Sequence, residues 1–182
     1  MPGVVITTAV RTGPSADTVR DSSQAFFVGL ALRGPEEKAT LVTSIADFEA
    51  QYGGYQSYAY LHPTIETFFE EGGTQCYVVR VVGPSATEGK HKLLDSSSGD
   101  SMQLTAVGPG DWSANMTFTV EAGTVASSVI LKLLYYNVQV FTSGNCTTVD
   151  QVIGKINGSA VASKYVTASS LGSNLPAALA ST

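Results

Sequence analysis

The segment "GGTQCYVVRVVGPS", residues 72–85, is typical of a β-strand held between two turns. Two glycines precede an apolar run rich in valine, and Gly83-Pro84 ends it. Such a run indicates a strand buried in a packed domain. The segment "AFFVGLAL", residues 25–32, has the same character, so we expect a second buried strand beside the first.

Two helices are predicted between these strands. The first, within residues 44–54, begins at Ser44, a suitable N-cap with Asp47 three residues later, and ends at a pair of glycines. The second begins near Pro63, which suits the first turn of a helix, and ends at Gly72. Its apolar stripe consists of Leu61, Ile65, Phe68 and Phe69. The order strand, helix, helix, strand predicts a sheet covered by helices.

The second half of the chain is rich in strand-forming residues. Five short segments of this kind lie between residues 92 and 143, separated by Gly, Asn and Ser. A short helix is expected at residues 147–158, with Thr147 as its cap, and a last strand at residues 164–171. "GPGDW", residues 108–112, predicts a tight turn that folds Trp112 back over the edge of a barrel or sandwich.

The predicted fold class is therefore α+β. It combines a small α/β sheet domain with two helices and a β-rich domain, barrel or sandwich-like, with one short helix. The expected parts are an extended N-terminal arm (1–24), the α/β portion (25–83), a linker (84–92), the β-rich domain (93–170) and a flexible tail (171–182).

The arm carries one strand-like segment, "GVVITTAV", with no hairpin partner nearby. Its residues are Gly3, Val4, Val5, Ile6, Thr7, Thr8, Ala9 and Val10. A lone strand leaves its backbone groups unpaired and must find a sheet edge. We expect that edge to lie on another copy of the chain.

Composition excludes several classes of function. Only 14% of the 182 residues are charged, against about 25% in ordinary domains, which is typical of a surface covered by other subunits. The net charge is −5 and no segment clusters Lys and Arg, so no nucleic-acid partner is expected. No apolar run reaches the roughly 18 residues of a membrane span, so no membrane partner is expected either.

The residues that carry chemistry are few. The two cysteines, Cys76 and Cys146, match no metal spacing and are expected to be reduced thiols. Of the two histidines, His62 stands at a helix start and His91 in the predicted linker, where it is expected to be solvated. Neither has a neighbouring nucleophile or metal ligand at a suitable spacing. We therefore expect no catalytic residue, no metal and no cofactor, and no enzymatic activity.

Four tyrosines lie close together in "QYGGYQSYAY", residues 51–60. They are Tyr52, Tyr55, Tyr58 and Tyr60. Tyrosine offers contact area and a hydroxyl group, which suits an interface between proteins. A loop packed on itself explains the cluster equally well, so both interpretations stay open.

In this order, the segments resemble the contractile tail sheath protein of myovirus-type bacteriophages and related contractile injection systems. The similar segments are "PGVVITTAV" (2–10), "AFFVGLALRGPEEKATLVTSIADFEAQYGG" (25–54), "TIETFFEEGGTQCYVVRVVG" (64–83) and "LTAVGPGDWSANMTFTV" (104–120). Each motif alone is weak, and it is their order and spacing over residues 2–120 that carry the resemblance.

The resemblance implies a structural virion protein of a phage tail, assembled in the bacterial host cytoplasm. Its arm would add a strand to neighbouring subunits, which form helical or hexameric rings around a tail tube and contract during infection. The family's further α/β domain, which faces the tube, has no counterpart here, so we expect a fragment or a shortened relative. The alternative is a β-rich binding or decoration module of a phage particle that does not contract.

Overall fold

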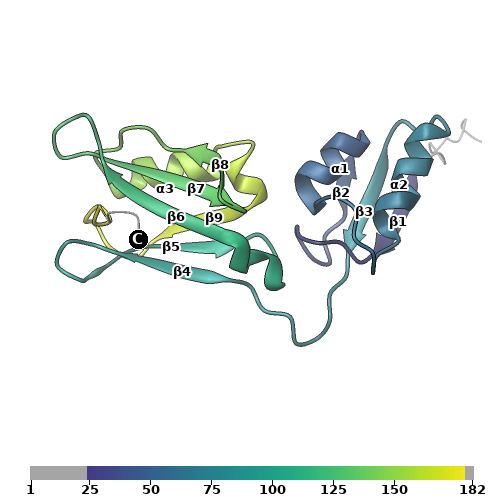
Figure 1. Cartoon of the computed structure of the whole chain (residues 1–182), viewed down its shortest axis with the longest axis horizontal. Helices are drawn as coiled ribbons and strands as arrows, with labels where there is room; N and C mark the ends of the chain where they lie inside the picture. The colour runs from purple at the N-terminus through teal and green to yellow at the C-terminus, as the bar shows by residue number, and fades with distance from the viewer. Residues whose placement is uncertain (1–23, 179–182) are drawn as a thin grey trace, which may run out of the picture.

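The computed structural model describes residues 24–178, and the expected arm strand, residues 3–10, lies outside this range. Within it, three α-helices and nine strands in three three-stranded sheets form two lobes (Figure 1). One segment, residues 81–89, runs from the first lobe to the second. The prediction of an α+β fold is confirmed.

The first lobe is built on a mixed sheet in which the segment at 72–85 supplies the central strand. The strands are β1 (Ala25–Gly29), β2 (Thr40–Val42) and β3 (Cys76–Arg80), in the order β1-β3-β2. β1 runs parallel to β3, and β2 runs antiparallel to it. Because β3 has a neighbour on each side, its side chains are the best covered in this sheet.

Two helices, α1 (Ile45–Tyr52) and α2 (Leu61–Glu70), pack on one face of this sheet. The Ser44 hydroxyl oxygen accepts a hydrogen bond from the Asp47 N–H at 3.1 Å, and Gly53 ends α1 with a φ of +86°. Pro63 lies in the first turn of α2, two positions after the first helical residue, Leu61. The buried side chains are Val42, Phe48, Tyr52, Leu61, Ile65, Cys76 and Val78.

The expectation that the segment at 25–32 is a fully buried strand is wrong. β1 ends at Gly29, and its side chains alternate between covered and exposed positions. Phe26 is 61% exposed and Val28 is 66% exposed. The helices cover only one face of the sheet, so every second residue of β1 faces outward.

The second lobe is a sandwich of two antiparallel sheets. Its strands are β4 (Lys90–Leu94), β5 (Asp100–Ala106), β6 (Met116–Ala122), β7 (Val129–Tyr135), β8 (Val138–Thr142) and β9 (Val166–Ser170). One sheet has the order β4-β5-β9 and the other the order β6-β7-β8. The helix α3 (Val149–Asn157) packs with both sheets around one core, separate from the core of the first lobe.

Helix α3 begins one residue later than expected. The Thr148 hydroxyl, not that of Thr147, caps the helix by accepting a hydrogen bond from the Gln151 N–H at 3.3 Å. Thr147 instead donates from its backbone and hydroxyl to the Gln151 side-chain oxygen. On the side of α3 that faces the core, Val152 and Ile156 are fully buried.

Two predicted boundaries are corrected. β4 begins at Lys90, so the last part of the expected linker is paired with β5, and the His91 ring stacks on Phe118 at 5.9 Å. The start of the expected flexible tail is also tied down. The Asn174 side chain donates to Asp95 at 2.7 Å, and the Ala177 N–H donates to the Leu94 carbonyl at 2.8 Å. The buried carboxylate of Asp95 and the carbonyl at the end of β4 thus bind the start of the tail, which the composition of the tail does not reveal.

Because the cores are separate, a cavity in one lobe should leave the other intact. We expect Leu131→Ala, at a side chain 1% exposed, to lower the free energy of unfolding of the second lobe by about 2–5 kcal/mol. Amide hydrogen exchange should accelerate in β5–β9 and α3 and stay slow in β3. Val125→Ala, at a side chain 52% exposed, is the control and should change neither the free energy of unfolding nor the exchange rates. Equal acceleration in β3 would contradict separate cores.

Candidate functional site

The first sheet has an open edge along β1. β1 pairs with β3 on one side, and within residues 24–178 no strand pairs with its other side. The Gly29 carbonyl accepts a hydrogen bond from the Val81 N–H at 3.0 Å, so the backbone groups of Gly29 face β3. Since this direction alternates along a strand, the backbone groups of Phe26 and Val28 face outward. They are placed to pair with an added strand.

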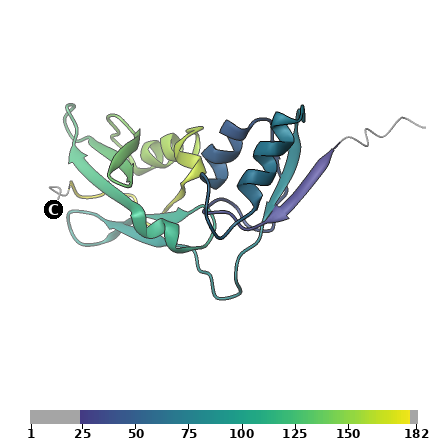
Figure 2. The same ribbon diagram turned by 45° about the vertical axis from the view of Figure 1, so that its right-hand side comes forward.

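The face of the sheet away from the helices is apolar and bare. Phe26 stacks on Tyr77 of β3 with their ring centres 5.0 Å apart, and Leu41 of β2 is 42% exposed beside them. In Figure 2, α1 and α2 lie between β1 and the second lobe, and no described segment covers the outer side of β1. Sheets with parallel strands are normally covered on both faces, which marks this surface for a contact.

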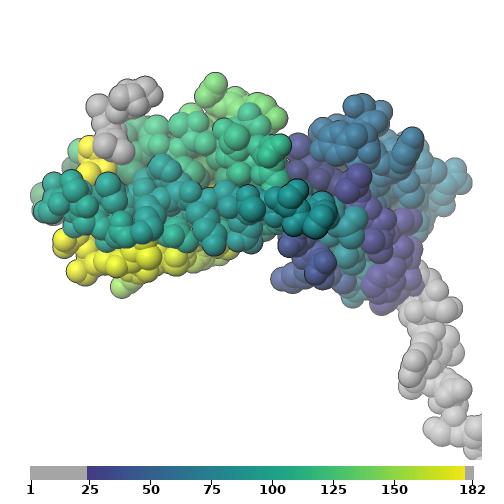
Figure 3. All heavy atoms as spheres, turned by 90° about the horizontal axis from the view of Figure 1, so that it is seen from below, coloured from purple at the N-terminus to yellow at the C-terminus, as the bar shows by residue number. Residues whose placement is uncertain are grey.

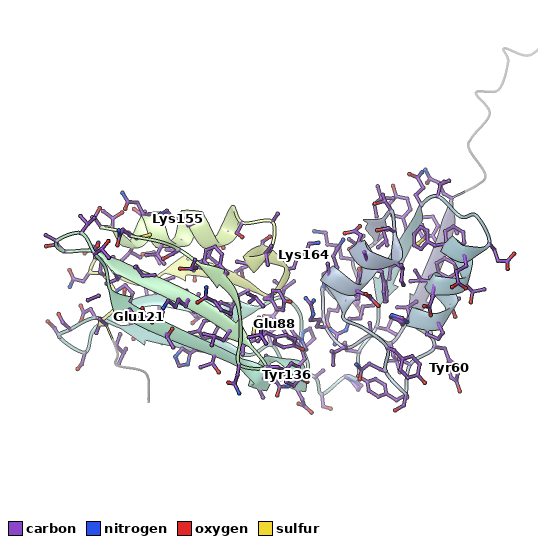
Figure 4. The ribbon with its side chains drawn as sticks, turned by 45° about the horizontal axis from the view of Figure 1, so that its top comes forward. Tyr60, Glu88, Glu121, Tyr136, Lys155 and Lys164 are labelled. Atoms are coloured by element: carbon purple, nitrogen blue, oxygen red, sulfur yellow. The ribbon has the colours of Figure 1, made fainter. Side chains whose placement is uncertain are left out.

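A groove of about 260 Å³ follows the open edge of β1. One wall is formed by residues 27–30, and the other by residues 58–61 with Thr64 of α2. Tyr58 and Tyr60 rise on this second wall and are 58% and 85% exposed. Figure 4 shows Tyr60 on the part of the first lobe away from the second lobe. An extended peptide bound to β1 would therefore lie between the bare face and these two rings.

The four predicted interface tyrosines do not form one group. Tyr52 is a core residue with 0% exposure, and its hydroxyl donates to the Val78 carbonyl at 3.3 Å. Burial raises the pKa of Tyr52. The predicted interface role of Tyr52 is therefore wrong, because helix α1 extends to this residue and turns its ring inward. Tyr55 is 64% exposed but leans its ring edge-on against His62, with centres 6.2 Å apart.

A second hollow, of about 530 Å³, opens between β4 and β6 in the second lobe. Leu104, Ala106 and Val166 line it together with the stacked pair His91 and Phe118. Polar residues such as Thr87, Ser113 and Thr117 share the lining with these groups, and Lys90 and Asp111 lie at the surface. The hollow can receive an apolar group, but it presents no pair of acid and base groups in hydrogen-bond contact.

The remaining chemical groups have structural partners. His62, 8% exposed, joins the two helices through a contact of 2.8 Å between its Nε2 and Glu49 Oε1. Cys76 and Cys146 are free thiols, one in each core, and burial raises the pKa of Cys76. Among the residues that the structure describes, no three His, Cys, Asp or Glu side chains gather as metal ligands. None of the helices described is both long and apolar enough to cross a bilayer.

Comparison with known proteins identifies the fold. No protein-family model matches the chain, and no curated protein shows significant sequence similarity to it. The structure is similar to that of the sheath tail protein Lin1278 from Listeria innocua, with a TM-score of 0.57 and 12% identity over 85% of this chain and 31% of that one. It is also similar to the sheath tail protein DSY3957 from Desulfitobacterium hafniense, with a TM-score of 0.54 and 14% identity over 97% of this chain and 37% of that one. The chain thus has the fold of about a third of a sheath protein.

Proposed function

We propose that this chain is a subunit, or part of a subunit, of a phage tail sheath. The observation that supports this most is the fold shared with two sheath tail proteins, which extends over 85% and 97% of this chain. The order of motifs along residues 2–120 points to the same family independently of the structure. In this proposal the protein is a virion component, assembled in the host cytoplasm into the tail.

Assembly uses the open edge and bare face of the first sheet. A strand from a neighbouring copy, residues 3–10, pairs with the outward backbone groups of Phe26 and Val28 and so extends the sheet beside the apolar face. Head-to-tail contacts of this kind generate rings where the rotation closes and helical arrays where it does not. The scarcity of charge on the chain suits a surface that other subunits bury.

Contraction and contact with a tail tube belong to the same proposal. The matched part spans about a third of the length of the two sheath proteins, so contact with the tube is assigned to polypeptide outside this match. The energy released on contraction comes from rearranged contacts between subunits and needs no chemical step. The chain is accordingly proposed to have no enzymatic activity and no cofactor.

One observation favours a second candidate. The hollow between β4 and β6 could hold an apolar group of a partner, as expected of a β-rich module that decorates a particle without contracting. Such a module would bind through the second lobe and would have no use for the open edge of β1. The two candidates therefore place the contact on different lobes.

Electron microscopy of virions that carry the gene distinguishes them. We expect gold-labelled antibodies against the purified chain to label the tail along its whole length. Label on the capsid alone, or at a single point of the particle, would support a decoration module. Virions without label, when the same antibodies detect the chain in denatured particles, would mean that the epitopes are covered, and labelling should then return on partially disrupted tails. Denatured particles that lack the chain would overturn the proposal.

A further inference from the structure

Three of the sequence motifs meet at the contact between the two lobes. The Arg33-Gly34 turn follows β1, Arg80 ends β3, and "GPGDW" at residues 108–112 follows β5. Figure 3 shows the lobes abutting, with the segment after β3 crossing from one to the other. The edge and groove described above use none of these motifs, so their convergence has another explanation.

Arg80 connects the lobes through carbonyl groups. Its side chain is 3% exposed. Within the first lobe, Nε donates to the Ala31 carbonyl at 3.1 Å and Nη1 to the Gly34 carbonyl at 3.0 Å. Nη2 reaches the second lobe and donates to the Pro109 carbonyl at 2.9 Å. A buried charge held this way has a fixed direction, because each acceptor belongs to the backbone.

Arg33 makes the second connection. Its Nη2 donates to the Ala50 carbonyl at 2.8 Å and to the Glu49 carbonyl at 3.2 Å, in the last turn of α1. These carbonyls form the negative end of the helix dipole. On its other side, the guanidinium carbon lies 4.2 Å from the ring centre of Tyr165, a cation–π contact with the second lobe. Nη1 is also 3.4 Å from the Lys164 carbonyl.

The backbones of the two lobes touch beside these arginines. Gly108 has a φ of +87°, and a Cβ atom there would lie 2.1 Å from the Gly34 carbonyl oxygen. Only glycine allows this approach, because any side chain would collide with the backbone of the other lobe. The "Gly-Pro-Gly" turn is thus explained by contact between the lobes as well as by its own geometry.

The contact has little else to hold it. The two apolar cores are separate, and the ion pair between Lys164 Nζ and Asp47 Oδ1, at 3.6 Å, is partly exposed and contributes little. Arg33 Nε and the Tyr135 hydroxyl are buried without a hydrogen-bond partner among the described residues. Burial also raises the pKa of Tyr135 to about 12. Polar contacts between lobes of this kind leave relative motion as the default, unless specific bonds prevent it.

We propose that Arg33 and Arg80 form a lock that fixes the orientation of the two lobes. With the lock intact, the lobes move as one body. Without it, each lobe keeps its own core and the pair moves about the segment at 81–89. This inference concerns the chain itself and does not depend on what the chain assembles into.

Residual dipolar couplings of the full chain test the lock. In the wild type, amides of both lobes should fit one common alignment tensor. Tyr165→Leu removes the cation–π contact but leaves the bonds of Arg33 to α1 and of Arg80 to Pro109, so both lobes stay folded and should fit the common tensor less well than in the wild type. Tyr165→Phe keeps the ring and loses only the 3.4 Å contact in which Arg33 Nη2 donates to the hydroxyl, so this matched control should retain a single tensor.

The double variant Arg33→Met/Arg80→Met removes both arginines of the lock. It should separate the two tensors, while the dispersed amide signals of both lobes report that each remains folded. Two tensors already present in the wild type would overturn the lock. A single tensor retained in the double variant Arg33→Met/Arg80→Met would overturn it equally.

Discussion

Arg80→Met is expected to lower the free energy of unfolding by about 3 kcal/mol or more, because it leaves several buried carbonyl acceptors without a hydrogen-bond donor. The carbonyls of Ala31, Gly34 and Pro109 lose their donor in a space that water does not reach freely. The aliphatic replacement fills similar volume, so a cavity adds little to the loss. Urea titration followed by far-ultraviolet circular dichroism measures the change.

The control for this variant is Lys92→Met. The Lys92 amine pairs with Asp100 at 2.6 Å, but both side chains are about half exposed, so the pair is worth less than about 1 kcal/mol. Arg80→Lys should fall between the two variants, because an ammonium group cannot reach separate carbonyls with the fixed fork of a guanidinium. If Arg80→Met and Lys92→Met cost the same, the carbonyls around Arg80 are satisfied in some other way.

Local signals in the sequence were sufficient for most of the helices and strands. Ser44 and Gly53 bound α1 as predicted, since a cap depends only on residues within one turn. The apolar run within residues 72–85 became the central strand because flanking glycines and β-branched residues act locally as well. The caps of α1 and the apolar run of β3 would predict the same helix and strand in almost any surrounding fold.

Properties that depend on distant segments were not predictable in the same way. The consecutive apolar residues of "AFFVG" hide the alternation of β1, because its outward side chains are as apolar as its inward ones. Tyr52 became a core residue because β3 provides an acceptor 26 positions away. Arg33 meets Tyr165 across more than 130 positions, and no spacing rule joins them. Whether a side chain is exposed, and which residue it contacts, depends on which faces of the helices and sheets the fold covers.

Val28→Pro is expected to abolish assembly of the chain while leaving its fold in place. The Val28 N–H faces the open edge, so proline removes no hydrogen bond to β3, and proline is tolerated on edge strands for this reason. It does remove a donor that an added strand would need. In sedimentation velocity, the wild-type full chain should form species larger than a monomer as its concentration rises, and Val28→Pro should remain a monomer.

Val28→Thr separates the backbone from the side chain in this test. Threonine keeps the N–H and the β-branched shape but makes the face more polar, so assembly should weaken without disappearing. If Val28→Pro associates as strongly as the wild type, the backbone of β1 is not the receiving edge. If Val28→Thr is as defective as Val28→Pro, contact through the bare face of Phe26 and Tyr77 dominates over strand pairing. A wild-type chain that stays monomeric at every concentration would remove the open edge from the proposed function, because backbone groups that face outward and an apolar face beside them would then have no partner in a second copy.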